Sequence, residues 1–308
     1  MKIAIIGAGR TNNGIGPFIG KFFQKNNADV TAVLGTSEAS TRKAAEALKH
    51  DGRVPRPYTE IDALLDNEPL DIAVIASPAV THLTYLTACI EAGLHIFCEK
   101  PFIDPGMPDV PGRLENIFQD SKRQRLTIAM NSQCPFLLAD YERFCGRLLP
   151  QDADHFSIRL SPMVDGRDMI PDSVPHALSL LYTVLGNGET EDLRIKQGEK
   201  QMAVTGIYRA LSTECRFRID LERHPRQPRP FSFGWNRRTI HRRITLEPYE
   251  ISFQYGDTIR KVADPLELSV QNFLAAIQKQ EDPKIGRDHI VDTTVLLKRI
   301  YDHWETSA

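Results

Sequence analysis

The sequence predicts an N-terminal α/β domain built on a doubly wound parallel sheet, followed by a C-terminal α+β domain with a mostly antiparallel sheet. Three observations predict this division. Short apolar runs alternate with helical patterns over residues 1–130, strand-like segments without long helices between them follow residue 190, and 308 residues suffice for two cores. We therefore expect two domains, one at residues 1–131 and one at residues 132–308.

The first domain is expected to contain five parallel strands joined by crossover helices. Continuous apolar runs of four to six residues are typical of strands that are buried on both faces of a sheet. Such runs predict strands at residues 2–6, 30–34, 71–76, 94–98 and 126–130. Helical periodicity predicts helices near residues 18–25, 40–49, 61–65 and 83–92, and Gly93 suits the end of the last one.

The second domain is expected to combine several neighbouring strands with a few helices. Strands are predicted at residues 156–160, 193–197, 203–209, 214–221, 243–246 and 250–254. Helices are predicted at residues 136–149, 174–185, 266–279 and 287–304, and residues 223–231, with three prolines, are expected to form a loop.

Composition excludes several classes of protein. A formal charge of −2 argues against a generally basic nucleic-acid binder, and no apolar run reaches the length of a membrane span. The first strand begins at residue 2, so we do not expect a signal peptide. Five cysteines, odd in number and without metal-ligand spacing, predict reduced and buried thiols in a cytoplasmic protein and no metal site.

A glycine-rich turn follows the first strand directly. Glycines at this point let the backbone approach a pyrophosphate at the start of a helix. Gly7 and Gly9 fit this pattern, whereas the usual third glycine is replaced by Asn12. We therefore expect a dinucleotide to contact Gly7, Gly9 and the loop residues Arg10, Thr11 and Asn12.

The end of the second strand lacks the carboxylate that usually binds the ribose 2′-hydroxyl of NAD. Gly35 occupies that position, and Thr36, Ser37 and Arg42 follow it. Hydroxyls and a guanidinium would hold a 2′-phosphate, so the sequence favours NADP over NAD. The alternative is that Thr36 or Ser37 caps the next helix and that Arg42 is a solvated helix residue.

Two further strand ends carry candidate residues. Ser77 and Pro78 follow the strand at residues 71–76, where they would lie against the dinucleotide, and His82 either joins them or simply begins its helix. The strand at residues 94–98 ends in Glu99, Lys100 and Pro101, where a lysine can reach a ligand in the crevice of such a sheet. Cys98 is expected to pack rather than to act as a nucleophile.

These segments resemble the Gfo/Idh/MocA oxidoreductases. The resembling residues are those of the glycine turn, Tyr58, the Ala-Ser-Pro turn with His82, the segment 91–95 and Cys98-Glu99-Lys100-Pro101, with weaker matches at residues 131–133, 172–176 and 269–278. The resemblance implies a Rossmann domain, a nicotinamide cofactor and sugar, cyclitol or related polyhydroxylated substrates. It also implies an antiparallel second domain that is often used for oligomerisation, here a homodimer or a homotetramer.

The resemblance further places the catalytic lysine at Lys100 and an Asp-x-Gly-x-His pattern at Asp172–His176, with Val174 where glycine is usual. An acidic position of some members is Ser179 here. His176 suits acid–base chemistry because its ordinary pKa lies near neutrality, and Asp172 shares its helix face. Without the resemblance, Asp172 would be read as a helix cap and His176 as a half-buried surface residue.

Other readings stay open at this stage. Residues 223–243 contain seven arginines, two histidines and no acid, which suggests either an anionic substrate or a solvated loop. Besides an NADP-dependent dehydrogenase or reductase acting on CH–OH groups, the sequence allows a non-catalytic dinucleotide-binding regulator. It also allows a lyase or glycosidase of the same family that recycles bound NAD.

Overall fold

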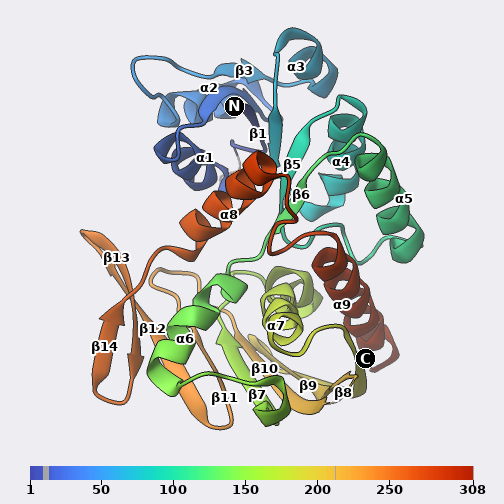
Figure 1. The fold of residues 1–308 in the computed structure, drawn as a ribbon, viewed down its shortest axis with the longest axis vertical. Coiled ribbons are helices and arrows are strands. Elements are labelled where there is room, and N and C mark those ends of the chain that lie inside the picture. The colour runs from blue at the N-terminus through green and yellow to red at the C-terminus, as the bar shows by residue number, and fades with distance from the viewer. Residues whose placement is uncertain (10–13, 212, 308) are drawn as a thin grey trace. The chain divides into compact units, whose positions relative to one another are not determined.

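The computed structural model describes residues 1–9, 14–211 and 213–307, which form two compact units (Figure 1). The first unit consists of Met1–Asn131 and Leu266–Ile290, and the second consists of Ser132–Pro265 and the chain from Val291 onward. Each unit has its own sheet and its own apolar core.

The first unit is built on a six-stranded sheet with the order β3-β2-β1-β4-β5-β6, in which every pair is parallel. This is the strand order of dinucleotide-binding Rossmann domains, with the change of direction between β1 and β4. The predicted doubly wound parallel sheet is therefore confirmed. The strands are β1 (Lys2–Ile6), β2 (Asp29–Leu34), β3 (Arg56–Tyr58), β4 (Ile72–Ile75), β5 (His95–Glu99) and β6 (Ile128–Asn131).

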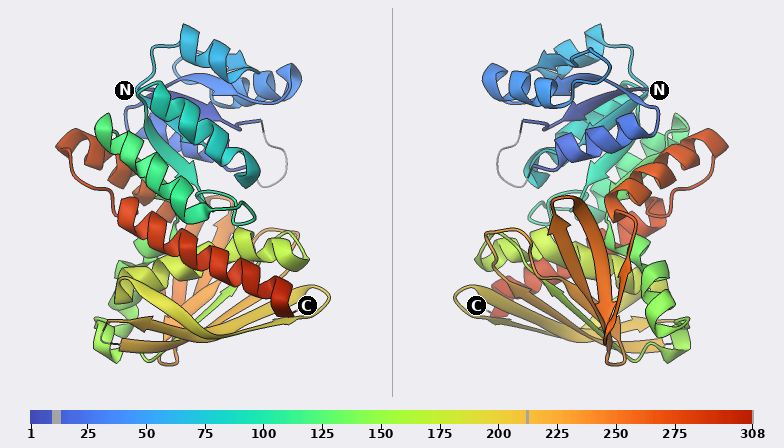
Figure 2. Two further views of the ribbon diagram at one scale, coloured as in Figure 1. Left: turned by 90° about the vertical axis from the view of Figure 1, so that its right-hand side faces the viewer. Right: turned by 90° about the vertical axis from the view of Figure 1, so that its left-hand side faces the viewer.

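Helices cover both faces of this sheet (Figure 2). Side chains of α1 and α2 share a core with β1, β2, β4, β5 and β6 on one face, and α4 and α5 belong to the other face. The helices are α1 (Gly16–Lys25), α2 (Glu38–Ala47), α3 (Ile61–Asn67), α4 (His82–Glu91) and α5 (Val110–Arg123). Strand β3 and helix α5 were not predicted, because β3 has only three residues and α5 begins with Pro111 and Gly112.

Helix α8 (Pro265–Lys279) packs in the first unit, although the sequence analysis placed it in the second domain. Phe273 is fully buried there, with its ring 5.3 Å from that of Phe97 on β5 and 6.3 Å from that of Phe23 on α1. Val270 joins the same core. The helix belongs to the first unit because its apolar face completes the core of the parallel sheet. Helical periodicity shows that one face is apolar, but it does not show which core that face joins.

The second unit contains an eight-stranded sheet with the order β14-β13-β12-β11-β7-β10-β9-β8. The β10–β7 pair is parallel, and the other pairs are antiparallel, so the predicted mostly antiparallel sheet is confirmed. The short strands β11 and β14 were not predicted. The strands are β7 (His155–Leu160), β8 (Gly188–Gln197), β9 (Gln201–Ala210), β10 (Thr213–Glu222), β11 (Ser232–Trp235), β12 (Arg238–Leu246), β13 (Tyr249–Tyr255) and β14 (Thr258–Lys261).

The helices of this unit are α6 (Leu138–Cys145), α7 (Met169–Leu185) and α9 (Arg287–Ser307), of which α9 begins in the first unit. The helix predicted at residues 136–149 is a 3-10 turn, Cys134–Leu137, followed by α6, which stops at Gly146 with φ +82°. Aromatic rings of Tyr141, Phe233 and Trp235 form the centre of the core. Among the residues described, no helix is long and apolar enough to cross a membrane.

Candidate functional site

The glycine turn after β1 fits tightly against the end of β4. Gly7 has φ +88°, and a Cβ atom there would lie 2.5 Å from the backbone nitrogen of Ser77. Its own amide donates to the carbonyl of Leu34 at 2.8 Å. A Cβ at Gly9 would lie 3.1 Å from Ser40. Glycine at residue 7 therefore lets the turn pass between the ends of β2 and β4, at the topological switch point where this fold binds dinucleotides.

Three of the predicted contacts in this turn, Arg10, Thr11 and Asn12, lie outside the described residues. The helix that follows, α1, begins at Gly16 with Pro17 in its first turn and no acidic residue there. A helix start without negative charge is compatible with a bound pyrophosphate.

The end of β2 presents hydroxyl groups. Ser37 caps α2, with its Oγ accepting from the amide of Ser40 at 3.4 Å and lying 2.7 Å from the Ser40 hydroxyl. Thr36 and Arg42 are exposed. Both local features of the alternative reading are present, because Ser37 is a cap and Arg42 is solvated.

Glu38 is a residue that the sequence analysis missed. Its carboxylate lies 3.5 Å from Arg42, one turn along α2, and both side chains are largely exposed. With Thr41 and residues 57–59, Glu38 and Arg42 line a small pocket of about 120 Å³. The sequence did contain a signal for this residue. Glu38 is an acid only three residues beyond Gly35, at the first position of the helix that follows the second strand.

The turn after β4 is held by hydrogen bonds of the Thr81 hydroxyl. Thr81 Oγ1 donates to Ser77 Oγ and contacts the Pro78 carbonyl, both at 2.7 Å. Pro78 is exposed and Ser77 is buried. This arrangement leaves Pro78 accessible to a ligand at the carboxyl end of β4.

His82 points into the protein. Its ring is 1% exposed, with Nδ1 2.9 Å from the Pro101 carbonyl and Nε2 2.9 Å from the Ser77 carbonyl. A carbonyl oxygen only accepts, so an imidazolium donates to both and a neutral ring donates to one of them. The imidazole thus joins the loops after β4 and β5. Its side chain contacts both loops that carry predicted cofactor residues.

The segment after β5 carries Glu99 and Lys100, both half-buried. Glu99 accepts a hydrogen bond from the side-chain amide of Asn131 at the end of β6, where the two residues are in register. Asn131 is a second residue that the sequence analysis did not assign to the site. Burial raises the pKa of the Cys98 thiol well above its usual range, and the side chain is fully buried. Cys98 is thus an inert packing residue, as predicted.

The second unit carries Asp172 and His176 on α7. They lie four residues apart on one helix face, and both are half-buried. Asp172 Oδ2 accepts from the Ser173 hydroxyl at 3.0 Å. Helix α7 begins at Met169 with Asp168 at the capping position, so Asp172 lies inside the helix and is not its cap. Ser179 is fully buried on the same helix.

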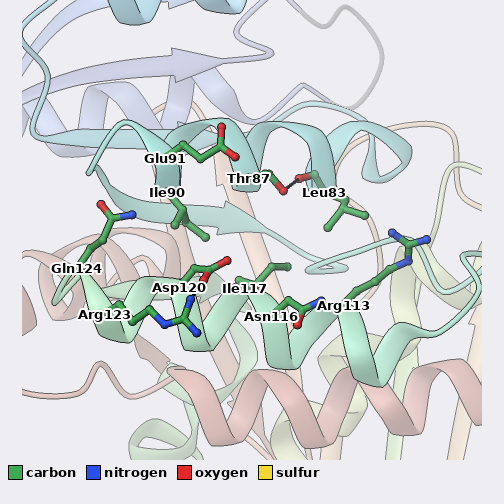
Figure 3. A pocket seen from close by; sticks show the side chains of 10 residues that line it. All are labelled: Leu83, Thr87, Ile90, Glu91, Arg113, Asn116, Ile117, Asp120, Arg123 and Gln124. Carbon is green, nitrogen blue, oxygen red and sulfur yellow. Dashed lines mark hydrogen bonds and ion pairs between the residues drawn. The ribbon is translucent and has the colours of Figure 1, made fainter.

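A larger pocket of the first unit lies elsewhere (Figure 3). It has a volume of about 590 Å³ and is lined by α4 and α5, with Leu83 and Arg113 at one end and Gln124 at the other. None of the predicted site residues lines it. The residues described contain no cluster of three side chains suited to holding a metal ion.

Comparison with known proteins agrees with this geometry. Residues 1–110 match the model of the oxidoreductase family with an NAD-binding Rossmann fold, GFO_IDH_MocA. Over 92% of both chains, the protein is 22% identical to D-xylose 1-dehydrogenase (NADP(+)) 2 of Haloferax volcanii. It is 32% identical to the inositol 2-dehydrogenase of Rhodococcus erythropolis over 33% of this chain and 28% of that one.

Solved structures show the same fold across the whole chain. The UDP-N-acetylglucosamine 3-dehydrogenase from Acidithiobacillus ferrooxidans has a TM-score of 0.73 at 18% identity, with 100% of this chain and 98% of that chain covered. A probable dehydrogenase from Thermotoga maritima has a TM-score of 0.74 at 15% identity, with both chains fully covered. The first 110 residues are thus similar to the Gfo/Idh/MocA oxidoreductase family, whose model describes an NAD-binding Rossmann fold.

Proposed function

We propose that this protein is an NAD(P)-dependent oxidoreductase that acts on a hydroxyl group of a sugar, a cyclitol or a related polyhydroxylated small molecule, with NADP as the favoured cofactor. The observation that carries the proposal is the Gly7 turn, which closes against Ser77 at the switch point of a β3-β2-β1-β4-β5-β6 sheet. A Cβ atom at residue 7 would not fit against the neighbouring strand end. Because glycine has no side chain, a dinucleotide can approach the backbone of the turn closely. The names of the relatives agree with a sugar or polyol substrate.

The preference for NADP rests on the residues after β2. Position 35 is a glycine. It is followed closely in the sequence by three hydroxyl residues, Thr36, Ser37 and Ser40, and by Arg42. In the ligand-free arrangement Arg42 lies 3.5 Å from Glu38. Both side chains are largely exposed, so this pair contributes little to stability and Arg42 is free to turn toward a 2′-phosphate. Glu38 is the residue that would favour NAD instead, by accepting from a ribose hydroxyl.

The cofactor, once bound, supplies or accepts the hydride. The remaining task is proton transfer at the substrate oxygen, which has to lose its proton as a hydride leaves the carbon. We assign Lys100 to polarise that oxygen and His176 to exchange the proton, with Asp172 orienting the imidazole from the same helix face. Glu99, held by Asn131, fixes the segment that presents Lys100.

We further propose that the protein works in the cytoplasm as a homodimer or a homotetramer. Along β7, one face of the sheet is exposed at His155, Ser157 and Arg159 while the alternating residues are buried. An antiparallel sheet with one solvated face is suited to pairing with a second copy.

Calorimetric titration with NADPH and with NADH tests the cofactor assignment. We expect the wild-type protein to bind NADPH at least tenfold more tightly. Arg42→Gln should remove that preference with little change for NADH, because one charge-assisted contact is worth about 1.5–3 kcal/mol. Glu38→Gln serves as the matched variant and should strengthen NADPH binding.

Two outcomes would contradict the proposal. A wild-type preference for NADH that Glu38→Gln abolishes would assign the cofactor as NAD. Failure to bind either dinucleotide would remove the oxidoreductase assignment altogether.

A further inference from the structure

Strand β12 carries two adjacent arginines on opposite faces of the sheet. Arg242 stands opposite Phe253 of β13 and faces the core, and Arg243 stands opposite Ser252 and faces outward. Arg243 is exposed and donates to Gln254 Oε1 at 2.7 Å. The same strand thus offers a core-facing arginine and an ordinary surface arginine side by side.

The Arg242 side chain contacts a phenyl ring and a backbone carbonyl. Its guanidinium carbon lies 4.9 Å from the centre of the Phe231 ring, and Nη2 donates to the Arg229 carbonyl at 3.0 Å. Its Nε is buried and makes no hydrogen bond. Within the described residues, no carboxylate lies at ion-pair distance from Arg242. The Nε–H group of this charged guanidinium is therefore a buried donor without a hydrogen bond among the described residues.

A second arginine increases the positive charge of this place. Arg229 is half-buried, and its Nη1 donates to the Ser161 carbonyl at 3.4 Å. In the described part of the chain it too lacks a carboxylate at ion-pair distance. Burial lowers the pKa of Arg242, and the neighbouring Arg229 charge acts in the same direction. Two such cations close together are unfavourable in the absence of an anion.

The other ionisable groups near Arg242 are Cys134, Tyr249 and Asp264. Burial raises the pKa of Tyr249, and the charge of Asp264, with which the Tyr249 hydroxyl interacts, acts in the same direction. Cys134 begins the 3-10 turn that directly follows Gln133. None of these groups neutralises the two arginines by direct pairing among the residues that the structure describes.

We propose that Arg242 and Arg229 bind an anionic group, a carboxylate or a phosphate, which the polyhydroxylated substrate carries. A guanidinium fork offers two parallel donors to such a group, and the Phe231 ring packs against the Arg242 guanidinium, with its centre 4.9 Å from the guanidinium carbon. That the anion belongs to the substrate rests on the proposed function. The existence of the anion site rests only on the second unit.

The site is tested first with inorganic phosphate alone, by calorimetric titration in a low-salt buffer. We expect phosphate to bind the wild-type protein and to bind Arg242→Gln at least tenfold more weakly. Arg243→Gln is the matched control on the same strand and should change the affinity less than twofold. Equal phosphate affinity in all three proteins overturns the proposal.

Unfolding by urea without phosphate separates binding from a structural role. We expect Arg242→Gln to be no less stable than the wild-type protein, because the substitution removes a buried charge that forms no ion pair with a carboxylate of the described residues. If Arg242 were a structural residue only, the variant would lose stability and phosphate would protect neither protein. Both observations together would overturn the proposal.

Turnover with NADP then distinguishes the ligand sources and the two proposals. Glucose, gluconate and glucose 6-phosphate present the same hydroxyls without an anion, with a carboxylate and with a phosphate. A raised KM for one acidic sugar in Arg242→Gln, with NADPH affinity unchanged, supports the proposal and names the anion. If the protein turns over neutral sugars and Arg242→Gln does not change that turnover, the anion-site proposal is overturned while the proposed function stands. Phosphate binding without any cofactor binding supports the anion site and removes the proposed function.

Discussion

Replacement of Gly7 by alanine tests whether the turn after β1 is shaped for close approach. Two separate penalties are expected. The first arises from φ +88°, a conformation that costs an alanine about 1–2 kcal/mol. The second arises because the new Cβ would lie 2.5 Å from the Ser77 nitrogen and 2.6 Å from its Cα, which are backbone atoms that cannot rotate away. Overpacking of this kind costs about 1–3 kcal/mol, so the total loss of stability should be about 2–5 kcal/mol.

Gly52→Ala is the matched control, because Gly52 has φ +78° and no atom within 4 Å of the Cβ position. It should lose only the first penalty, about 1–2 kcal/mol. The difference between the two variants measures the clash alone. The assay is urea unfolding followed by far-ultraviolet circular dichroism, since both tryptophans, Trp235 and Trp304, belong to the second unit. Equal losses in the two variants, or unchanged NADPH affinity in Gly7→Ala, would refute the reasoning.

Three further predictions concern the first unit. Burial lowers the pKa of His289 to about 3, so only the unfolded chain takes up this proton as the pH falls from about 6.5, and stability should decrease by about 2 kcal/mol by pH 5. His289→Gln should flatten the pH dependence of urea unfolding between pH 7 and pH 5; a slope equal to that of the wild-type protein would contradict this. Phe273→Ala should cost about 3–5 kcal/mol, against less than about 0.5 kcal/mol for the exposed Phe18→Ala, and equal thermal shifts would show that α8 is not part of this core. His82→Ala removes the partner of two carbonyls and should cost about 2 kcal/mol or more and weaken dinucleotide binding, whereas the exposed His50→Ala should do neither.

The parallel sheet was predictable because its strands are continuous apolar runs. Strands β1, β4 and β5 are buried along nearly their whole length, and that burial is written in their composition. Strand β3 escaped prediction because it is a three-residue edge strand that contains Pro57 and buries little. Helix α5 escaped because Pro111 and Gly112 read as a break, although both are acceptable in a first turn that Asp109 caps.

Packing partners were harder to predict than elements. The helix at residues 266–279 was expected at almost its observed bounds, yet its periodicity shows only that one face is apolar. Which core receives that face depends on contacts across more than 170 residues of sequence, between Phe97 and Phe273. The same limit explains why Glu38 and Asn131 were not assigned to the site. Their relevance follows from their neighbours in space, Arg42 and Glu99.

His82 was singled out in the sequence analysis, but the sequence could not show which groups its ring contacts. The sequence analysis left two readings of it open, a cofactor contact beside Ser77 and Pro78 or simply the first residue of its helix, and His82 is indeed the first residue of α4. In the fold its ring turns inward, and its two nitrogens meet the carbonyls of Ser77 and Pro101, one in the loop after β4 and one in the loop after β5. The Ser77 backbone is also the surface against which Gly7 closes. The Ser77 backbone therefore contacts the glycine turn on one side, and the His82 imidazole links it to the segment that carries Lys100. In the proposed dinucleotide site, such a link would help to hold the three loops within the tolerance that hydride transfer requires.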